Sequence, residues 1–442
     1  MFLINEIQFI DRWDSYIMVN LITGAADIID THVYDELISN TFNLDNDIIS
    51  LLLQRHYIFH SYDEYKHFVN EIDNRICMLE EKSVPNFVLI PSYACNLSCT
   101  YCYEQTYKID KNIIFNNPYE IIDKQFEFID NILSSSIYDK TQDVRITIMG
   151  GEPLLYNQFG IIKYIIDVSK AKGFTVDIVT NGVELDKFLY ILKSTVVDHI
   201  QVTLDGIKEV HDKRRIFRDK SGSFEKIFKN IQLALNENIK TYLRVNLDVE
   251  NIGTIHLLAK SLQELSNVNN LFPYIYLLQD GGCSGDSNVI MELSGIEQLS
   301  EIEKKYPEVA IFYKRYHPMQ FIDSILKNQK FMPCSKHCGA SKNQYILDCK
   351  GYIYKCWHGI GNSEYSCGSY YPKIYFNDKF NKWKNRSTLY LSKCNDCKYR
   401  YICGTGCPAA QHKGIGCFDI EKESCVDYEG LIEILFNKLM DI

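Results

Sequence analysis

The stretch NFVLIPSYACNLSCTYCYE, residues 86–104, places a short apolar run directly before a loop with three cysteines. The run NFVLI has the length and composition of a fully buried strand. Five further apolar runs follow it, separated by amphipathic stretches of helix length: VRITIM, FTVDIVT, DHIQVTL, TYLRVNLDV and YIYLL. Alternating strands and helices predict a parallel sheet with right-handed crossovers. We therefore expect an α/β fold over residues 86–290, built as a partial, TIM-like (β/α)6 barrel.

Distinctive residues follow the first four predicted strands. Each segment alone could be an ordinary turn, because Asn-Gly and Asp-Gly pairs are common turn formers. In parallel barrels, however, the residues that do chemistry lie at the carboxyl ends of the strands. We expect four segments to converge on one mouth, which predicts an active site there: Cys95–Cys102, Gly150–Pro153, Thr180–Gly182 and Asp205–Gly206.

The three cysteines are spaced Cys95-x3-Cys99-x2-Cys102 on one loop. Three thiolates can hold three irons of a cubane cluster and leave the fourth iron open. An open coordination position is what a catalytic metal needs. The alternative is a tetrahedral zinc site with a fourth ligand elsewhere in the chain. Zinc favours paired C-x2-C units, so the observed spacing favours the iron–sulfur cluster.

This cysteine pattern, with Tyr101 before the last cysteine, resembles the signature of the radical S-adenosylmethionine (SAM) superfamily. The resemblance runs from about residue 86 to residue 280. It implies that the methionine part of SAM chelates the open iron of a [4Fe-4S] cluster. An electron from the cluster would then cleave SAM to a 5'-deoxyadenosyl radical, which abstracts hydrogen from a substrate.

The resemblance also implies five contacts to SAM. Gly150, Gly151 and Glu152 match the GGEP motif of the superfamily, in which the glycines allow close backbone approach. Glu152 would accept hydrogen bonds from the methionine ammonium group. Thr203 matches a position that contacts the carboxylate or the ribose, and Asn181 would lie on the ribose side.

Cysteine usage divides the chain, since 11 of its 16 cysteines follow residue 330. The first residues, MFLINEIQFI, carry no secretory signal, so metal binding is favoured over disulfides and a cytoplasmic location is expected. Residues 334–442 resemble the SPASM domain, an auxiliary module with two further [4Fe-4S] clusters. That resemblance implies two ligand sets: Cys334, Cys338, Cys356 and Cys407, and Cys394, Cys397, Cys403 and Cys425.

Some of these assignments have rivals. Cys349 could replace Cys334, and Cys417 could replace Cys425, while Cys283 and Cys367 remain unassigned. Two zinc knuckles are the alternative for the whole zone. The complete prediction is one SAM-binding cluster and two auxiliary clusters.

Residues 1–85 contain a predicted hairpin in YIMVNLITGAADII, followed by short helices. This pattern resembles the winged-helix-like element that recognises the leader of a precursor peptide, although a structural cap is an alternative. Residues 291–333 are expected to form a helical connector. The net charge of -10 and the pI near 5.6 disfavour nucleic acid, and no apolar run is long enough to span a membrane.

The resemblance predicts an oxidoreductase that modifies a ribosomally made precursor peptide, for example by a thioether cross-link. A flavodoxin or ferredoxin would act as the reductant. The alternatives are a sulfatase-maturating, formylglycine-generating enzyme and a non-enzymatic iron–sulfur or zinc scaffold. The sulfatase family places an Asp directly after the G-x4-C cysteine, where this chain has Trp357. The catalytic base is not identified; His358, Asp205 and Glu364 are candidates only.

Overall fold

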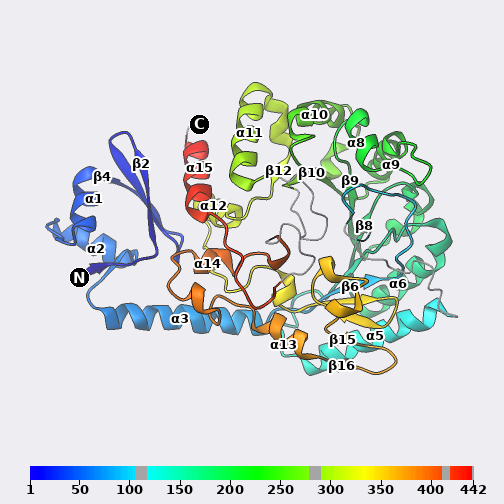
Figure 1. Cartoon of the computed structure of the whole chain (residues 1–442), viewed down its shortest axis with the longest axis horizontal. Coiled ribbons are helices and arrows are strands. Elements are labelled where there is room, and N and C mark those ends of the chain that lie inside the picture. Colours follow the sequence, from blue (N-terminus) through cyan, green and yellow to red (C-terminus); the bar gives the residue numbers. More distant parts are fainter. Residues whose placement is uncertain (103, 105–116, 278–289, 411–418, 441–442) are drawn as a thin grey trace.

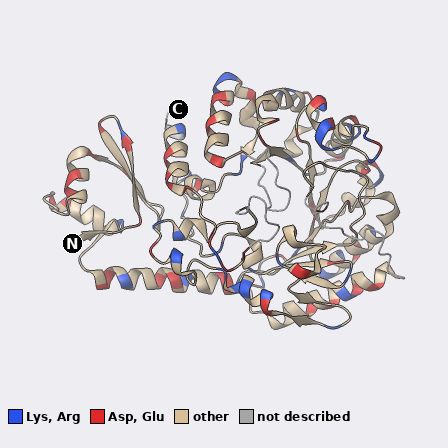
Figure 2. Cartoon of the chain, in the orientation of Figure 1, with Lys and Arg blue, Asp and Glu red and all other residues tan. Residues whose placement is uncertain are grey.

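The computed structural model describes residues 1–442 except 103, 105–116, 278–289, 411–418 and 441–442. A small N-terminal module lies at one end of the molecule, and the long helix α3 (Tyr62–Glu81) leads from it along the base of a larger body (Figure 1). Acidic and basic residues are interspersed along α3 and the outer helices (Figure 2). Of the helices in the described residues, none is long and apolar enough to cross a membrane.

Within the described residues, a curved sheet of eleven strands organises the larger body, in the order β12-β11-β10-β9-β8-β7-β6-β13-β14-β15-β16. The pairs from β12 to β13 are all parallel. The six predicted strands are all present, which confirms the α/β fold class. Their bounds are β6 (Asn86–Ile90), β7 (Arg145–Ile148), β8 (Thr175–Thr180), β9 (Val197–Thr203), β10 (Thr241–Leu247) and β11 (Leu271–Leu277).

Helices cover the outer side of this sheet (Figure 1). Alternate strand residues, such as Leu243, Val245 and Leu247 of β10, join the largest hydrophobic cluster with the helices. The intervening residues, such as Arg244 and Asn246, therefore face the inner side of the sheet. The covering helices are α5 (Pro118–Ser135), α6 (Phe159–Lys172), α7 (Leu189–Leu192), α8 (Lys208–Arg214), α9 (Phe224–Asn236) and α10 (Ile255–Gln263).

The segment expected to be a helical connector contains more than helices. It holds α11 (Glu292–Lys305), the strand β12 (Tyr313–Lys314) and α12 (Met319–Leu326). The two residues of β12 pair in parallel with β11 and extend the sheet at that edge. A two-residue strand has no periodicity of its own, so the sequence pattern could not reveal it.

The C-terminal zone also extends the sheet, which the sequence did not suggest. All five residues of β13 (Gln344–Asp348) are buried, and β13 pairs in parallel with β6. This pairing gives the backbone of β6 a partner on its other side, which a buried strand requires. The remaining elements are β14 (Tyr352–Tyr354), β15 (Gly368–Ser369), β16 (Tyr375–Phe376), α13 (Asp378–Asn385), α14 (Arg400–Cys403) and α15 (Tyr428–Met440).

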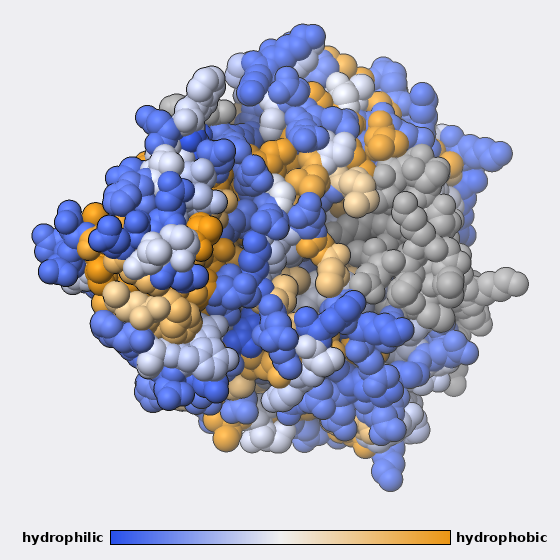
Figure 3. Space-filling view, turned by 60° about the vertical axis from the view of Figure 1, so that its left-hand side comes forward, coloured by the Kyte–Doolittle hydropathy of each residue, from blue (hydrophilic) through white to orange (hydrophobic). Residues whose placement is uncertain are grey.

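Much of the N-terminal module packs in a second hydrophobic cluster, which includes Met18, Leu37, Leu52 and Tyr57 and also Tyr401 of the C-terminal zone. The other face of its sheet joins the largest cluster through Ile10, Ile17, Val19 and Leu21. Its antiparallel sheet has the order β2-β3-β4, and a separate pair joins β1 to β5. Orange, apolar side chains gather on the side of the molecule that carries the module (Figure 3). The elements before α3 are β1 (Phe2–Leu3), β2 (Ile7–Arg12), β3 (Ser15–Asn20), β4 (Ala26–Asp30), α1 (Thr31–Ile38), α2 (Asn46–Gln54) and β5 (Ile58–Phe59).

Candidate active site

The three-cysteine loop follows β6 and is held by the segment that follows α8. The backbone N–H of Ser98 donates to Ile216 O at 2.7 Å, and that of Thr100 donates to Arg214 O at 2.9 Å. The Arg218 guanidinium donates to Cys95 O at 3.0 Å. These contacts are made largely by the backbone, so they hold the loop whatever occupies its thiols.

Gly150 and Gly151 pack directly against the start of the same loop. A Cβ added at Gly150, where φ is +145°, would lie 2.5 Å from Ser92 O, and one at Gly151 would lie 2.4 Å from Ala94 O. The Gly151 N–H donates to Ser92 O at 3.2 Å. The glycines thus allow two backbone segments, the loop and the end of β7, to approach each other.

Glu152 is buried at the end of β7, and three donors converge on its carboxylate. The Thr180 hydroxyl donates to Oε1 at 2.6 Å, and the backbone N–H groups of Leu154 and Asn181 donate at 2.8 and 2.5 Å. Burial raises the pKa of Glu152 to about 7, although these hydrogen bonds favour the ionised form. The side chain is therefore fixed in orientation beside the cysteine loop.

Asn181 and Thr203 lie at the ends of the next two strands, and both are buried. The Asn181 amide donates to Asn96 Oδ1 at 2.7 Å and lies 3.8 Å from Cys95 Sγ. Strand pairing places Thr203 next to Arg244 of β10. Asn181 and Glu152 are thus joined to the cysteine loop, while Thr203 lies on the inner face of the sheet.

Tyr101 anchors a buried polar network that sequence reasoning did not reveal. Its hydroxyl donates to Asp205 Oδ2 and accepts from Arg215 Nη1 at 2.8 Å and from Asn246 Nδ2 at 3.2 Å. The Arg214 guanidinium lies 5.1 Å from the centre of the Tyr101 ring. In the sequence, the only sign of this network is Tyr101 itself, the aromatic residue of the cysteine signature. No spacing rule links Tyr101 to residues that follow β9 or lie in β10.

Asp205 therefore does not lie free as a catalytic base, because it is fully buried and hydrogen-bonded. Its second oxygen accepts from the Asn246 N–H at 3.1 Å. The other two candidates lie in the C-terminal zone, where Glu364 is exposed and His358 is half-buried. These contacts therefore do not identify Asp205, His358 or Glu364 as a proton acceptor that is available beside the cysteine loop.

The thiols of the loop are not gathered at the spacing of a single zinc site. Thiolates bound to one tetrahedral zinc would lie about 3.8 Å apart, from Zn–S bonds of about 2.3 Å. In the part of the chain that the structure describes, no three cysteine sulfurs lie within 4.8 Å of one another. Burial raises the pKa of Cys95 to about 12, and a bound metal ion would favour its thiolate form.

The C-terminal cysteines form two groups. Burial raises the pKa of Cys356 well above its ordinary value, and the nearby thiols of Cys407 and Cys338 raise it further. Burial likewise raises the pKa of Cys394 to about 11, with contributions from Cys397 and Cys425. These two sets share no cysteine.

Cys403 belongs to the second group, and the Cys334 thiol lies beside it. Burial raises the pKa of Cys403 to about 12, with contributions from Cys394, Cys397 and Cys334. The Cys334 thiol lies 3.7 Å from Ile402 O, the residue before Cys403. Cys334 thus lies beside the second group in the structure, whereas the resemblance to the SPASM domain implies a set of Cys334 with Cys338, Cys356 and Cys407.

The remaining cysteines differ in position. Cys367 is fully buried in a cluster with Cys338, Cys356 and Cys407 packed around it. Cys349 lies in a different hydrophobic cluster, with Tyr93 and Tyr354. Cys283 and Cys417 lie outside the described residues. Cys367, rather than Cys349, is thus the neighbour of the first group.

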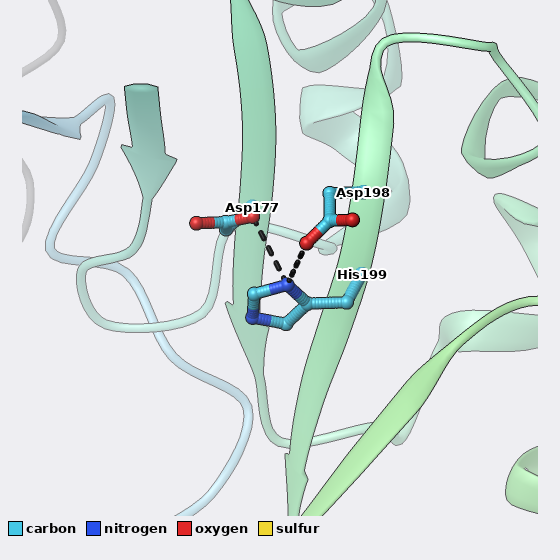
Figure 4. Close-up of side chains that lie close together, drawn as sticks. All are labelled: Asp177, Asp198 and His199. Carbon is cyan, nitrogen blue, oxygen red and sulfur yellow. Dashed lines mark hydrogen bonds and ion pairs between the residues drawn. The ribbon is translucent and has the colours of Figure 1, made fainter. Parts of the chain in front are cut away.

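A carboxylate–histidine cluster lies at the opposite, amino-terminal ends of the strands. His199 Nδ1 lies 3.1 Å from Asp177 and 2.8 Å from Asp198 (Figure 4). Arg145 and Lys240 pair with the same carboxylates. Burial lowers the pKa of His199, but the hydrogen bonds to the two carboxylates outweigh it and raise the pKa overall. The cluster is a neutralised ion-pair network that joins β7, β8 and β9.

Fold and site together have the features of a radical SAM domain: a curved parallel sheet with a three-cysteine loop after its first strand and GGE after its second. Residues 89–262 match the family described as the radical SAM superfamily, and they form the radical SAM domain of this chain. This domain is accordingly that of an enzyme whose cofactors are SAM and an iron–sulfur cluster.

Two curated relatives illustrate the similarity. An alignment with the Fe-coproporphyrin III synthase of Methanosarcina barkeri is 29% identical and covers 38% of this chain and 39% of that enzyme. An alignment with the cysteine-type anaerobic sulfatase-maturating enzyme of Clostridium novyi is 22% identical and covers 74% of this chain and 88% of that enzyme. The chain thus spans under half of the first relative and most of the second.

Two solved structures share the fold. Native anSMEcpe with bound AdoMet has a TM-score of 0.58 at 14% identity, over 80% of this chain and 98% of that one. Streptococcus suis SuiB bound to S-adenosylmethionine has a TM-score of 0.52 at 15% identity, over 92% of this chain and 96% of that one. The likeness to SuiB covers the larger share of this chain.

Proposed function

We propose that this chain is a peptide maturase that uses a radical generated from SAM to oxidise a ribosomally made precursor, for example to a thioether. Cys95, Cys99 and Cys102 would hold the cluster that binds SAM. When bound, these cofactors would supply the 5'-deoxyadenosyl radical. The roles of Glu152 and Asn181 in this proposal are to orient SAM beside the loop, with Gly150, Gly151 and Thr203 lining its site.

The N-terminal module is the observation that carries the proposal. Its helices and one face of its sheet pack in a second hydrophobic cluster, and it precedes the radical SAM domain. On β2, Gln8 contacts Glu429 O and the Tyr399 hydroxyl of the C-terminal zone, so that edge faces the rest of the chain. Among the described strands, β4 pairs only with β3. An open edge can accept an extended peptide as an added strand, which suits recognition of a leader.

Two comparisons bear on the choice of substrate. The solved structures include SuiB bound to its precursor peptide SuiA, with a TM-score of 0.51 over 92% of this chain. Formylglycine formation is the alternative, because the curated relatives include anaerobic sulfatase-maturating enzymes. Trp357 follows Cys356 at the position where the sulfatase family has an Asp, and it is partly exposed. A tryptophan cannot take a proton from a substrate thiol, which favours peptide maturation.

Two auxiliary clusters complete the proposal, and a flavodoxin or ferredoxin would supply the electron. Cys338, Cys356 and Cys407 would hold the first cluster, and Cys394, Cys397, Cys403 and Cys425 the second. The resemblance to the SPASM domain implies Cys334 as the fourth ligand of the first cluster, and the packing offers Cys367. Iron content and Mössbauer spectra of the Cys334→Ala and Cys367→Ala variants would distinguish the two.

Anaerobic co-expression with the short reading frames that neighbour the gene tests the proposed activity. A cross-linked product should be lighter than the unmodified precursor by two hydrogen atoms, as measured by mass spectrometry. A Glu152→Gln variant should leave the precursor unmodified. A product that has lost sulfur and gained an aldehyde would support the sulfatase-maturating alternative and contradict cross-linking.

A further inference from the structure

Two arginines lie on the inner face of the sheet, between the cysteine loop and the C-terminal cysteines. Arg244 points away from the hydrophobic cluster that holds Leu243 and Val245. Its strand neighbour on β11 is Tyr274. Arg315 directly follows β12, the next strand along, and its N–H donates to Ile275 O at 3.3 Å. Both arginines thus belong to the wall formed by β10, β11 and β12.

Each guanidinium is stacked on a tyrosine of β11. The Arg244 guanidinium carbon lies 4.4 Å from the centre of the Tyr276 ring, and that of Arg315 lies 4.1 Å from the centre of the Tyr274 ring. Arg244 Nε also donates to Asn246 Oδ1 at 2.8 Å. The Arg244 guanidinium also forms a hydrogen bond with the Tyr274 side chain. Stacking fixes the plane of a guanidinium, and its remaining N–H groups can bind a planar, two-oxygen acceptor.

Neither guanidinium is neutralised by a carboxylate of the described chain. No described Asp or Glu oxygen lies within 4.0 Å of Arg244 or Arg315, whereas Arg145 and Arg214 both form ion pairs. Glu292, which acts electrostatically on Tyr276, is engaged instead with the backbone and ring of His317 at 2.8 and 2.5 Å. The wall therefore carries two oriented positive charges without a described counter-charge.

The position of the wall relative to the cysteines shows where a ligand bound by these two charges would lie. Asn246, which accepts from Arg244, donates to the Tyr101 hydroxyl on the cysteine loop at 3.2 Å. Tyr276, which stacks on Arg244, is close enough to Cys407 and Cys338 to interact with them electrostatically. A ligand held by Arg244 would thus lie between the radical-generating loop and the first group of C-terminal cysteines.

We propose that Arg244 and Arg315 form a carboxylate-binding site that anchors an acidic side chain of the peptide substrate. The proposal rests on the proposed function, and it restricts the substrate to a peptide with Asp or Glu near the residue to be modified. The methionine carboxylate of SAM offers the same chemistry, so the test must separate the two sources.

The test uses the reconstituted full-length enzyme with SAM and two probes, N-acetyl-aspartate methylamide and N-acetyl-asparagine methylamide. Saturation-transfer NMR should show binding of the aspartate probe at millimolar concentration and binding of the asparagine probe at least tenfold weaker. Arg244→Gln and Arg315→Gln should each weaken binding of the aspartate probe at least fivefold. Arg244→Lys, which keeps the charge but loses the planar fork, should fall between wild type and Arg244→Gln.

Arg75→Gln, on the exposed face of α3, is the matched control and should leave probe binding unchanged. Equal binding of both probes to the wild type would overturn the carboxylate site. So would a loss of SAM affinity in Arg244→Gln with unchanged binding of the aspartate probe, because the arginine would then serve the cofactor. Release of 5'-deoxyadenosine is measured separately, so failure of the proposed function would be visible apart from failure of this site.

Discussion

At the scale of single residues, Tyr101 links the cysteine loop to the sheet. Replacing it by Phe would remove the hydroxyl that donates to Asp205 and accepts from Arg215 and Asn246. Buried polar groups left without partners cost about 1–3 kcal/mol each. We expect Tyr101→Phe to lower the free energy of unfolding by about 2–3 kcal/mol, measured by urea denaturation.

Tyr190→Phe provides the control for that substitution, since the Tyr190 side chain is 84% exposed. Removing an exposed hydroxyl should change the free energy of unfolding by less than about 0.5 kcal/mol. Equal effects of the two substitutions would contradict the structural role given to Tyr101.

His211 predicts a dependence of stability on pH. Its Nδ1 accepts the Asp205 N–H at 3.2 Å and its Nε2 contacts Ser223 at 3.0 Å, so the folded state holds the neutral ring. Burial lowers its pKa from 6.5 to about 4. The unfolded chain therefore binds more protons between these values. The neutral His211 ring therefore contributes about 3 kcal/mol to the free energy of unfolding. This contribution is complete above pH 6.5 and is lost as the pH falls through about 4.

Denaturation of wild type and His211→Asn at several pH values would measure this contribution. The variant lacks the titrating ring, so its stability should fall less steeply on acidification. Parallel pH profiles for the two proteins would show that another group causes the acid dependence.

At the scale of elements, the glycines after β7 determine how closely the cysteine loop packs. Gly151→Ala would place a Cβ 2.5 Å or less from backbone oxygens of Tyr93 and Ala94. The loop must then move, so we expect loss of about one third of the bound iron and at least tenfold slower cleavage of SAM. Iron analysis and chromatography of 5'-deoxyadenosine measure the two effects.

Gly253→Ala is the matched control, because nothing lies within 4 Å of its added Cβ. It should retain full iron content and activity. A similar loss in both variants would point to a general effect on folding instead of a specific effect on the loop.

Elements differ in how well sequence reasoning anticipates them. The six strands from β6 to β11 were predictable, because each apolar run is followed by an amphipathic helix. β13 was not, since QYILD is a short apolar run among cysteines and pairs with β6 from more than 200 residues away. The partners of Glu152 are equally long-range: Thr180 and Asn181 reach it only after the sheet has formed.

At the scale of the whole molecule, cysteines from distant segments converge on separate groups. Three cubane clusters would hold about twelve iron atoms per chain, four in each. We expect Cys407→Ala to lose about four of these, because its thiol lies with Cys338 and Cys356. Cys349→Ala, in another cluster of the core, should retain all of them. Iron loss from Cys349→Ala alone would contradict the grouping.

The resemblance to the SPASM domain, and not local spacing, divides the C-terminal cysteines into two ligand sets. It places Cys334 in a set with Cys338, and in the fold Cys334 lies beside Ile402 and Cys403. Which cysteines lie together depends on how α14 and the turn after β14 are packed. Local sequence patterns do not predict this packing.

The central claim is that the loop of Cys95, Cys99 and Cys102 holds a cluster with one iron open to SAM. Electron paramagnetic resonance of the dithionite-reduced protein, with Cys407 and Cys394 replaced by Ala to remove the auxiliary signals, tests it most directly. Added SAM should change the spectrum of the remaining cluster and release 5'-deoxyadenosine. A spectrum that SAM leaves unchanged, with no nucleoside released, would contradict the account.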